Sequence, residues 1–279
     1  MSRGLSHLRE ALGRGIPVVT SNKWPVALHG VELARLARSQ GIPLRAESTV
    51  LSGTPVLSTL VEGLAGATPI GVRGIMNATV NAILTDMAAG KSYERALADA
   101  QQAGLAERDP AADVEGHDAM AKLMIISALV FGRQLRREDV ACQGITGITR
   151  AEIDDAAASG GRIRHVGTLE FAGPGGAGEV SARVAPMPLP GDNLLAAVDG
   201  LANAVVCRAS PVGEITIVGP GAGPELAGQG VLSDLISVAR QSGYRSIYVT
   251  NVSSTYGMNW STPRSAKCSF TATAIKLNS

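Results

Sequence analysis

The sequence predicts an α/β protein that combines a partial Rossmann-like parallel sheet with an α+β region built on a mixed sheet. Between residues 5 and 46, short apolar strands alternate with amphipathic helices, which is typical of a parallel sheet with crossover helices. From residue 162 onward, apolar residues recur with a period of two between turn residues, which is typical of antiparallel or mixed strands. With 279 residues, of which 45% are hydrophobic, the chain is long enough for one large domain or two smaller ones.

The N-terminal segments predict two helix and strand pairs. "LSHLREALGRG" is amphipathic and ends in glycine, so we expect a short helix, and the apolar "IPVV" then predicts a buried strand that ends in "TSNK". A second helix, "PVALHGVELARLARSQG", leads to a second strand, "IPLRAE". Parallel sheets bind ligands at the carboxyl ends of their strands. Lys23 and Glu47, which follow these strands, are therefore candidate ligand-binding residues.

The same reasoning predicts the remaining elements. We expect helices at residues 53–66, 79–90, 92–104, 109–131 and 225–241, with a further short one ending near residue 160. We expect strands at residues 68–77, 162–173, 179–190, 202–210 and 213–223. The Ser- and Thr-rich tail from residue 242 does not continue this pattern.

The helix "DPAADVEGHDAMAKLMIISALVF", residues 109–131, carries acids and one lysine at the edge of an apolar stretch. Asp118 and Lys122 are one turn apart, and Glu115 falls on the same face, with Asp113 just outside it. A pair at this spacing is commonly a solvated ion pair, and from this stretch alone that interpretation stays open. The apolar continuation favours the other one, because a lysine at the mouth of a buried helix needs a partner and can then hold or deliver a proton.

Composition excludes several functional classes. The net charge of +1, with scattered Lys and Arg, argues against nucleic-acid binding and against a polybasic membrane patch. Cys142, Cys207 and Cys268 show neither CxxC nor metal-ligand spacing, which favours reduced thiols. The N-terminus lacks the apolar core of a signal peptide, and no apolar run is long enough for a membrane span. We therefore expect a cytoplasmic protein that acts on a small molecule.

Two glycine-rich segments are candidates for cofactor loops. "GPGGAG", residues 173–178, matches GxGxxG, but a strand pattern follows it, so a hairpin loop is the better interpretation. "GPGAG", residues 219–223, lies between a strand and a helix, where its missing side chains allow close approach of a ligand. Taken alone, this second segment fits a tight turn as well as a cofactor contact through Gly221 and Gly223.

Six segments together resemble the homoserine dehydrogenase family over roughly residues 5–238. They are "GIPVVTSNKWPVALHG", "AESTVLSGTPVLSTL", "GIMNATVNAILTDM", "AQQAGLAERDPAADVEGHDAMAKLMIISAL", "GITGIT" and "GPGAG…GVLSDL". The resemblance implies reduction of L-aspartate 4-semialdehyde to L-homoserine with NADPH or NADH, a step toward threonine and methionine. It also implies a homodimer that pairs through the sheet of the middle domain.

The resemblance also implies roles for particular residues. Lys122 corresponds to the proton-donating lysine, Asp118 orients the reacting oxygen or a water, and Lys23 lies near both substrate and nicotinamide. The other implied residues are Glu107, Asp113, Asn77, Thr79 and Asn81 for the substrate, and Thr20, Asn22, Lys23, Gly221 and Gly223 for NADP or NAD. Ala78 replaces a family glycine, which would impair binding if that position required positive φ.

A sodium site is a further implication of the resemblance. Its ligands would be Glu47, Val50, Ser52 and Thr54, since a carboxylate with carbonyl oxygens suits a hard cation. "VLSG" departs from the family's "VAGG" at this point. The alternative is a glutamate that simply ends a strand.

The resemblance finally implies a division of the chain. Residues 1–46 correspond to a remnant of the dinucleotide-binding domain and residues 47–213 to the catalytic and dimerisation domain. Residues 214–241 return to the nucleotide-binding side, and residues 242–279 form the atypical tail. The family's nucleotide-binding half with GxGxxG is not in this sequence. We therefore expect weak turnover, or an inactive chain that acts at most as a substrate-binding or dimer-forming subunit.

Overall fold

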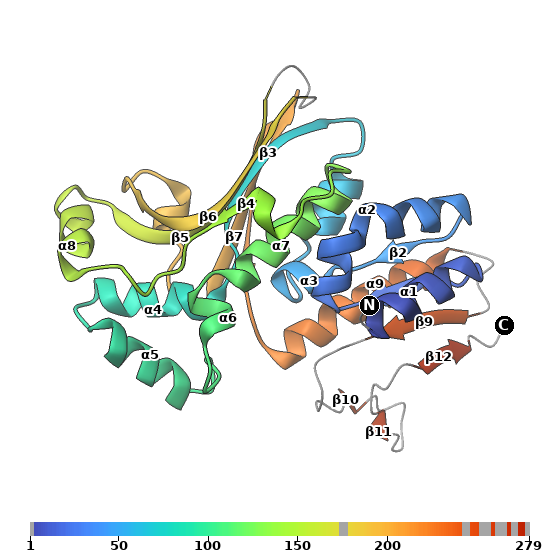
Figure 1. Ribbon diagram of the computed structural model, residues 1–279, viewed down its shortest axis with the longest axis horizontal. Helices are drawn as coiled ribbons and strands as arrows, with labels where there is room; N and C mark the ends of the chain where they lie inside the picture. The colour runs from blue at the N-terminus through green and yellow to red at the C-terminus, as the bar shows by residue number, and fades with distance from the viewer. Residues whose placement is uncertain are drawn as a thin grey trace.

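The computed structural model describes residues 3–172 and 178–241, together with the backbone of four short strands further on. These strands are β9 (Ser246–Thr250), β10 (Met258–Asn259), β11 (Lys267–Cys268) and β12 (Thr273–Lys276). Apart from them, the expected Ser- and Thr-rich tail lies outside the described residues. Figure 1 shows the N-terminal helices on one side and the larger sheet on the other.

The N-terminal part contains the predicted parallel strands. Its elements are α1 (Arg3–Gly13), β1 (Val18–Thr20), α2 (Lys23–Ser39) and β2 (Leu44–Arg45). β1 pairs in parallel with β2 on one side and with β9 on the other. The apolar stripe of α1 packs against α2, and Arg9 forms two hydrogen bonds of 2.7 Å with Glu32 across the two helices. Because β1 ends at Thr20 and α2 begins at Lys23, Lys23 lies just beyond the carboxyl end of β1.

Helix α2 is kinked at His29, whose backbone leaves helical geometry (φ −138°, ψ 17°). The side chain of Gln134 forms hydrogen bonds with backbone groups on both sides of the kink. Its Nε2 donates to the carbonyl of Ala27 at 2.6 Å, and its Oε1 accepts from the amide of Val31 at 3.3 Å. Because interrupted helical hydrogen bonds need other partners, this glutamine fixes the direction of the helix that begins at Lys23.

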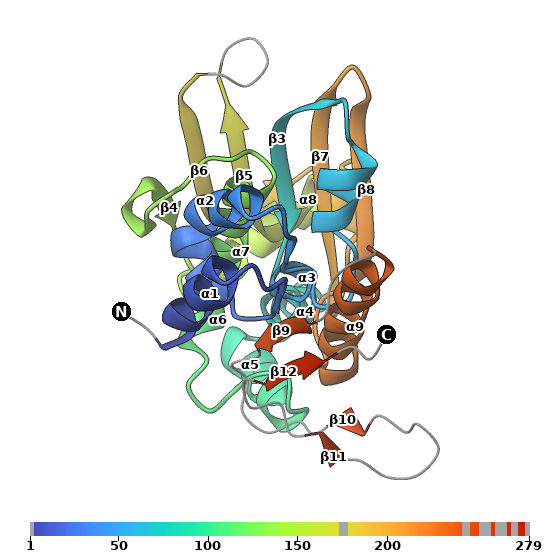
Figure 2. The same cartoon turned by 90° about the vertical axis from the view of Figure 1, so that its right-hand side faces the viewer.

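The second part is built on a six-stranded mixed sheet with the order β4-β6-β5-β3-β7-β8. Its strands are β3 (Thr68–Ile75), β4 (Val140–Cys142), β5 (Arg162–Phe171), β6 (Val180–Leu189), β7 (Ala202–Ser210) and β8 (Gly213–Pro220). Its longer helices are α4 (Ala78–Ala88), α5 (Tyr93–Gln102), α7 (His117–Leu129) and α8 (Arg150–Ala158). Helices α4, α7 and α8 pack on β5, and Figure 2 shows the strands from β6 to β8 in succession.

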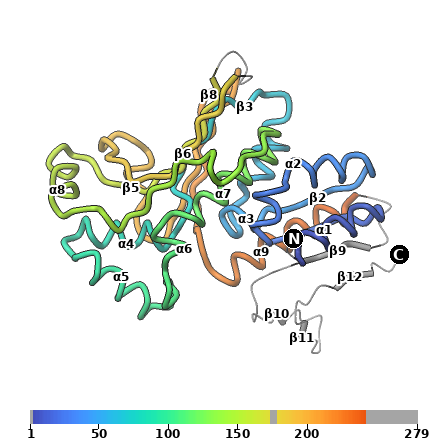
Figure 3. The backbone as a smooth tube through the Cα atoms, in the orientation of Figure 1, coloured from blue at the N-terminus to red at the C-terminus, as the bar shows by residue number. Residues whose placement is uncertain are grey.

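Short elements connect these layers. They are α3 (Ser48–Leu51), the π-helix η1 (Thr59–Gly63), α6 (Ala111–Val114), and the 3-10 turns η2 (Arg137–Asp139) and η4 (Leu194–Ala197). α9 (Pro224–Arg240) then returns to the N-terminal part, where it packs against α3 and β1 (Figure 3). The mixed α/β architecture predicted from the sequence is confirmed.

Two predicted helices differ from the structure. The helix expected at residues 109–131 is two helices, because Gly116 adopts φ +87° and turns the chain between α6 and α7. The helix expected at residues 53–66 shrinks to the π-helix η1. The hairpin interpretation of the first glycine segment agrees with the antiparallel pairing of Phe171 with Val180 on either side of it, although residues 173–177 lie outside the described residues.

Candidate active site

Asp118 lies between two lysines that come from different helices. Its Oδ2 accepts a hydrogen bond from Lys122 Nζ at 2.7 Å, and its Oδ1 accepts one from Lys23 Nζ. The Lys122 and Asp118 side chains are 8% and 10% exposed, whereas Lys23 is 40% exposed. Lys23, Asp118 and Lys122 are called the lysine–aspartate cluster below. The helical spacing predicted from the sequence therefore forms a buried ion pair, open to solvent on the Lys23 side.

A main-chain carbonyl provides the second contact of Lys122. Its Nζ donates to the carbonyl of Met76 at 2.6 Å, at the end of β3. An ammonium group has three N–H donors, and Asp118 and Met76 take two of them among the described residues. Burial lowers the pKa of Lys122, against the opposing effect of Asp118. The third N–H is free to point at a ligand oxygen, and the lowered pKa of the ammonium group favours donation of its proton to that oxygen.

Asn77 joins the lysine–aspartate cluster to Asp113. Its Oδ1 accepts the amide of Val80 and so caps α4, which fixes the orientation of its side chain. Its Nδ2 donates to Asp113 at 2.7 Å and to Asp118 at 2.9 Å. Three segments far apart in the chain thus converge on one polar group within an apolar core.

The two carboxylates differ in their electrostatics. Burial raises the pKa of Asp113, and the hydrogen bond from Asn77 only partly offsets this effect. Burial would also raise the pKa of Asp118, but Lys122 and Lys23 outweigh it, and the pKa of Asp118 falls well below its ordinary value. Asp118 therefore remains an anion at neutral pH. Among the residues that the structure describes, no cationic side chain forms an ion pair with Asp113, so a positively charged ligand would complete its environment.

Several predicted residues contact backbone instead of lining the cluster. Thr79 donates to the carbonyl of Leu105 at 2.8 Å, and Asn81 Nδ2 donates to the carbonyls of residues 198, 200 and 202. The structure therefore gives both side chains roles in holding loops. Ala78 is the first residue of α4 and does not have positive φ, so the glycine missing there causes no backbone strain.

Glu107, Thr20 and Asn22, the other candidates from the sequence, make no contact with Asp118 or Lys122 among the hydrogen bonds of the described residues. Glu107 is exposed in the loop before α6, and Thr20 Oγ1 accepts the amide of Asn22 at 3.1 Å just before Lys23. The expectation that Glu115 joins Asp118 on one face was wrong. Its carboxylate pairs with His117 at 3.1 Å on the exposed surface, because the turn at Gly116 redirects the chain between Glu115 and Asp118.

The Glu47 carboxylate already holds part of the backbone. Its two oxygens accept the amides of Leu57 and Ser58, both at 2.7 Å, so the side chain anchors the segment before η1. The carbonyl of Thr54 accepts the amide of Val56 at 2.9 Å, and Ser52 adopts φ +55° beside the loop at Gly221. Among the described residues, no group of three or more His, Cys, Asp or Glu side chains is placed to hold a metal. The arrangement favours the structural interpretation of Glu47.

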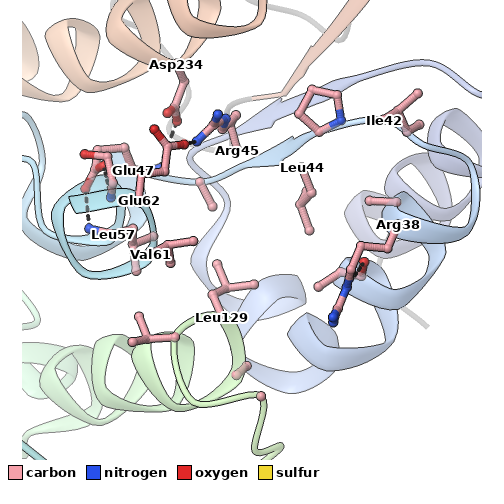
Figure 4. A pocket seen from close by; sticks show the side chains of 18 of the residues that line it. Arg38, Ile42, Leu44, Arg45, Glu47, Leu57, Val61, Glu62, Leu129 and Asp234 are labelled. Atoms are coloured by element: carbon pink, nitrogen blue, oxygen red, sulfur yellow. Dashed lines mark hydrogen bonds and ion pairs between the residues drawn. The ribbon is translucent and has the colours of Figure 1, made fainter. Parts of the chain in front are cut away.

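A cavity of about 600 Å³ lies beside Glu47, at the C-terminal end of α7, whereas Asp118 and Lys122 lie nearer the start of that helix. Figure 4 shows apolar side chains such as Leu44, Val61 and Leu129 around it, with Asp234 at one end. Asp234 Oδ2 accepts the backbone amide of Glu47 at 2.9 Å. Burial raises the pKa of Asp234 to about 7. Sequence reasoning missed this residue, although a single acid in the apolar stretch "GVLSDLISV" was a usable signal.

The raised pKa of Asp234 predicts a stability difference that depends on pH. A folded-state pKa above the unfolded value near 3.9 gives stability that is complete below pH 4 and is lost as pH rises through 7. Asp234→Asn keeps an acceptor for the Glu47 amide but cannot ionise. The difference of about three pKa units corresponds to at most about 4 kcal/mol. Because water in the cavity would solvate the ionised carboxylate, we expect the variant to be more stable than the wild type at pH 8 by about half of this, about 2 kcal/mol.

Urea unfolding at pH 5 and pH 8 measures this effect. At pH 5 the wild type has lost only about a third of this stability, so the gain of the variant should be clearly smaller there than at pH 8. Asp154→Asn, on the exposed surface of α8, is the control and should show no such pH-dependent gain. A gain of the same size at both pH values would contradict the assignment.

Comparison with known proteins agrees with this geometry. The family model described as homoserine dehydrogenase matches residues 55–236. The chain belongs to the homoserine dehydrogenase family. It is 40% identical over 233 residues to an NAD(+)-dependent homoserine dehydrogenase from Pseudomonas canavaninivorans, a match that covers 84% of this chain and 65% of that protein.

Solved structures of the family share the fold. A homoserine dehydrogenase from Thiobacillus denitrificans has a TM-score of 0.79 and 35% identity, with coverage of 86% of this chain and 55% of that one. A hyperthermophilic archaeal homoserine dehydrogenase in complex with NADPH has a TM-score of 0.73 and 32% identity, with coverage of 86% and 69%. The chain thus spans between about half and two thirds of the length of these relatives. Within the part of the chain that the structure describes, no helix is long and apolar enough to cross a membrane.

Proposed function

We propose that this chain carries the catalytic site of a homoserine dehydrogenase, which reduces L-aspartate 4-semialdehyde to L-homoserine with NADPH or NADH. The observation that carries the proposal is the buried Asp118 between Lys122 and Lys23. Reduction of an aldehyde places negative charge on its oxygen, and a preorganised cation beside that oxygen stabilises the charge. The named relatives, one NAD(+)-dependent and one solved with NADPH, support both the reaction and the cofactor class.

Lys122 acts on the carbonyl oxygen in this proposal. Asp118 and the Met76 carbonyl fix its ammonium group, so its third N–H points at the oxygen without reorganisation. The proton passes from Lys122 Nζ to the forming alkoxide, and its lowered pKa favours that transfer. Asp118 orients Lys122, and Lys23 lies at the open side, where it meets both the oxygen and the cofactor.

Asp113 and Glu107 bind the α-ammonium group of the substrate in this proposal. Asp113 is held by Asn77 at 2.7 Å, and it faces the cluster without an ion pair to any cationic side chain that the structure describes. An ammonium ligand would offset the burial that raises its pKa. Glu107 supplies a second, exposed carboxylate at the entrance.

The cofactor would contact the end of β1 and the glycine segment before α9. Thr20, Asn22 and Lys23 would hold it on one side, and Gly221 and Gly223 would let it approach the backbone on the other. When bound, the reduced nicotinamide supplies the hydride. The buried side-chain amide of Asn203 lies beside Gly221 and has no hydrogen-bond partner among the described residues, which supports the fit of this region to the ring.

Sodium binding and dimerisation are secondary proposals. Sodium would depend on main-chain carbonyls near Val50, because the Glu47 carboxylate is occupied. A homodimer is supported by the face of the sheet that carries the ion pairs Arg73–Glu214 and Arg208–Glu170, whose side chains are about half exposed. Light scattering tests the dimer, and a monomer in buffers with and without sodium would exclude it. Sodium binding is tested by urea unfolding in sodium chloride and in potassium chloride at equal concentration, and equal midpoints would exclude it.

Calorimetric titration with L-homoserine, beside an assay of NADPH or NADH oxidation with L-aspartate 4-semialdehyde, tests the main proposal. We expect Asp113→Asn to bind L-homoserine at least about tenfold more weakly, because a charged hydrogen bond is lost. Wild-type affinity should also fall as pH drops through the raised pKa of Asp113. Asp154→Asn is the control for a surface carboxylate. If the folded wild type shows no binding and no turnover, the proposal is refuted. If it binds L-homoserine but shows no turnover, this chain is restricted to substrate binding.

A further inference from the structure

Asn203, near the start of β7, has a side chain that is fully buried and has no hydrogen-bond partner. The residue is 0% exposed, and neither Oδ1 nor Nδ2 has a partner among the described residues. An unpaired buried amide is costly, and native proteins rarely leave both of its atoms unsatisfied. A bound group with both a donor and an acceptor would satisfy this amide.

The position of Asn203 connects it to the candidate active site. Val205 and Cys207 pack in the same core cluster as Met76 and Leu123 of α7, whereas Ala204 and Val206 belong to a different cluster. The alternation of a strand puts Asn203 on the α7 side. Since Ile75 pairs with Ala204, continuing this antiparallel register places Asn203 beside Met76, whose carbonyl holds Lys122.

Gly221 covers the other side of the same amide. A Cβ at Gly221 would lie 2.1 Å from Asn203 Nδ2 and 2.7 Å from its Oδ1, so only glycine fits there. The carbonyl of Gly221 accepts the hydroxyl of Ser52 at 3.3 Å, and its amide donates to Leu201 at 3.2 Å. Asn203 therefore lies between the glycine segment and the main-chain carbonyl that holds Lys122.

We infer that Asn203 recognises the carboxamide of the nicotinamide ring, an inference that rests on the proposed function. A primary amide offers one donor and one acceptor edge, and it can pair with a second primary amide through two complementary hydrogen bonds. Pairing requires residues 221–223, which follow β8, to shift away from the Asn203 amide when the ring enters. Ser21 Oγ, two residues before Lys23, is a further buried polar atom without a partner near the lysine–aspartate cluster.

The test uses reduced nicotinamide mononucleotide, which contains the ring and its carboxamide but no adenosine half. Binding is followed by the fluorescence of the reduced ring in the full chain and in Asn203→Leu, which keeps the shape of the side chain. We expect at least about tenfold weaker binding by the variant, since both hydrogen bonds are lost. Asn193→Leu, which removes an amide that caps η4, is the matched control and should bind within twofold of the wild type.

A second probe separates recognition from packing. The analogue with an acetyl group in place of the carboxamide has no N–H donor, so the wild type should bind it more weakly than the parent nucleotide. Asn203→Leu should bind the two probes equally. Gly221→Ala, whose Cβ would displace the amide, should also weaken binding of the parent nucleotide if Asn203→Leu folds poorly.

The outcomes distinguish this inference from the proposed function. Asn203→Leu should unfold at a urea concentration equal to or above that of the wild type, because the amide has no partner to lose. A large loss of stability would overturn the inference, since it would show a partner within the ligand-free protein. Equal binding of the nucleotide by wild type and variant would also overturn it and leave the proposed function intact. Absence of nucleotide binding by the wild type would overturn both.

Discussion

Lys122→Met is expected to reduce turnover by about 10³-fold and to leave the fold intact. Methionine fills the space of the lysine side chain but offers no proton and no charge to the carbonyl oxygen, and losses of about 10²–10⁴ are usual for such groups. The loss should appear mainly in kcat, because substrate affinity is assigned to Asp113 and Glu107. Asp118 keeps Lys23 as a partner in the variant, which limits the cost of a buried unpaired anion.

Steady-state oxidation of NADPH or NADH, together with calorimetric titration of L-homoserine, checks this prediction. Lys91→Met is the matched control, since Lys91 pairs with Asp86 and Asp99 at the surface, away from the lysine–aspartate cluster. The control should retain turnover within about twofold, as expected for an exposed pair. Retained turnover in Lys122→Met would exclude Lys122 as the proton donor. Loss of both binding and turnover would assign it to substrate binding instead.

Arg164→Ala is expected to lower the free energy of unfolding by about 3–5 kcal/mol, because a fully buried guanidinium loses several hydrogen bonds at once and leaves a cavity, whereas Asp199 is 54% exposed and stays solvated. Arg164 lies on β5 and is 0% exposed. Its guanidinium donates to the carbonyl of Ala196 at 2.7 Å, to Thr85 Oγ1 at 3.2 Å and to the carboxylate of Asp199. The variant therefore loses the link between β5, α4 and the segment around η4, and it leaves a cavity.

Urea unfolding at pH 7 measures this effect against Arg150→Ala. Arg150 pairs with Asp154 one turn away on the surface of α8 and donates one further hydrogen bond to the carbonyl of Met87 at 3.0 Å, so we expect its loss to cost about 1–2 kcal/mol. Arg164→Met, which restores apolar volume without charge, should recover part of the lost stability. Equal losses in Arg164→Ala and Arg150→Ala would contradict the assigned structural role.

The periodicity of the sequence predicted the layers well because it reports local burial. Alternation along β5 to β8 and the helical pattern of α2 and α9 follow from which face of each element meets the core. The same reasoning failed at Gly116. Continued apolar residues favoured one helix, and the left-handed φ at that residue depends on the space beside Cys142 and His165.

The lysine–aspartate cluster was only half predictable from residue patterns. The spacing of Asp118 and Lys122 follows from helical geometry, so the sequence alone determined that this pair meets. Asn77, 41 residues from Asp118, entered the prediction through the family resemblance. Lys23, 95 residues from Asp118, was a candidate because it follows a predicted parallel strand, but no local rule predicted its contact with Asp118.

By itself, the sequence determined the α/β class, the family and the i, i+4 pair at the start of a buried helix, because these depend on local periodicity and on ordered motifs. Only the tertiary structure decided that Asn77 links Asp113 to Asp118 while Glu115 pairs with His117, that Asn81 holds a loop, and that Asn203 has no hydrogen-bond partner among the described residues. The physical reason is that hydrogen-bond partners and burial are set by segments far apart in the chain. A residue type shows what it can bind, and the fold decides which groups come within reach.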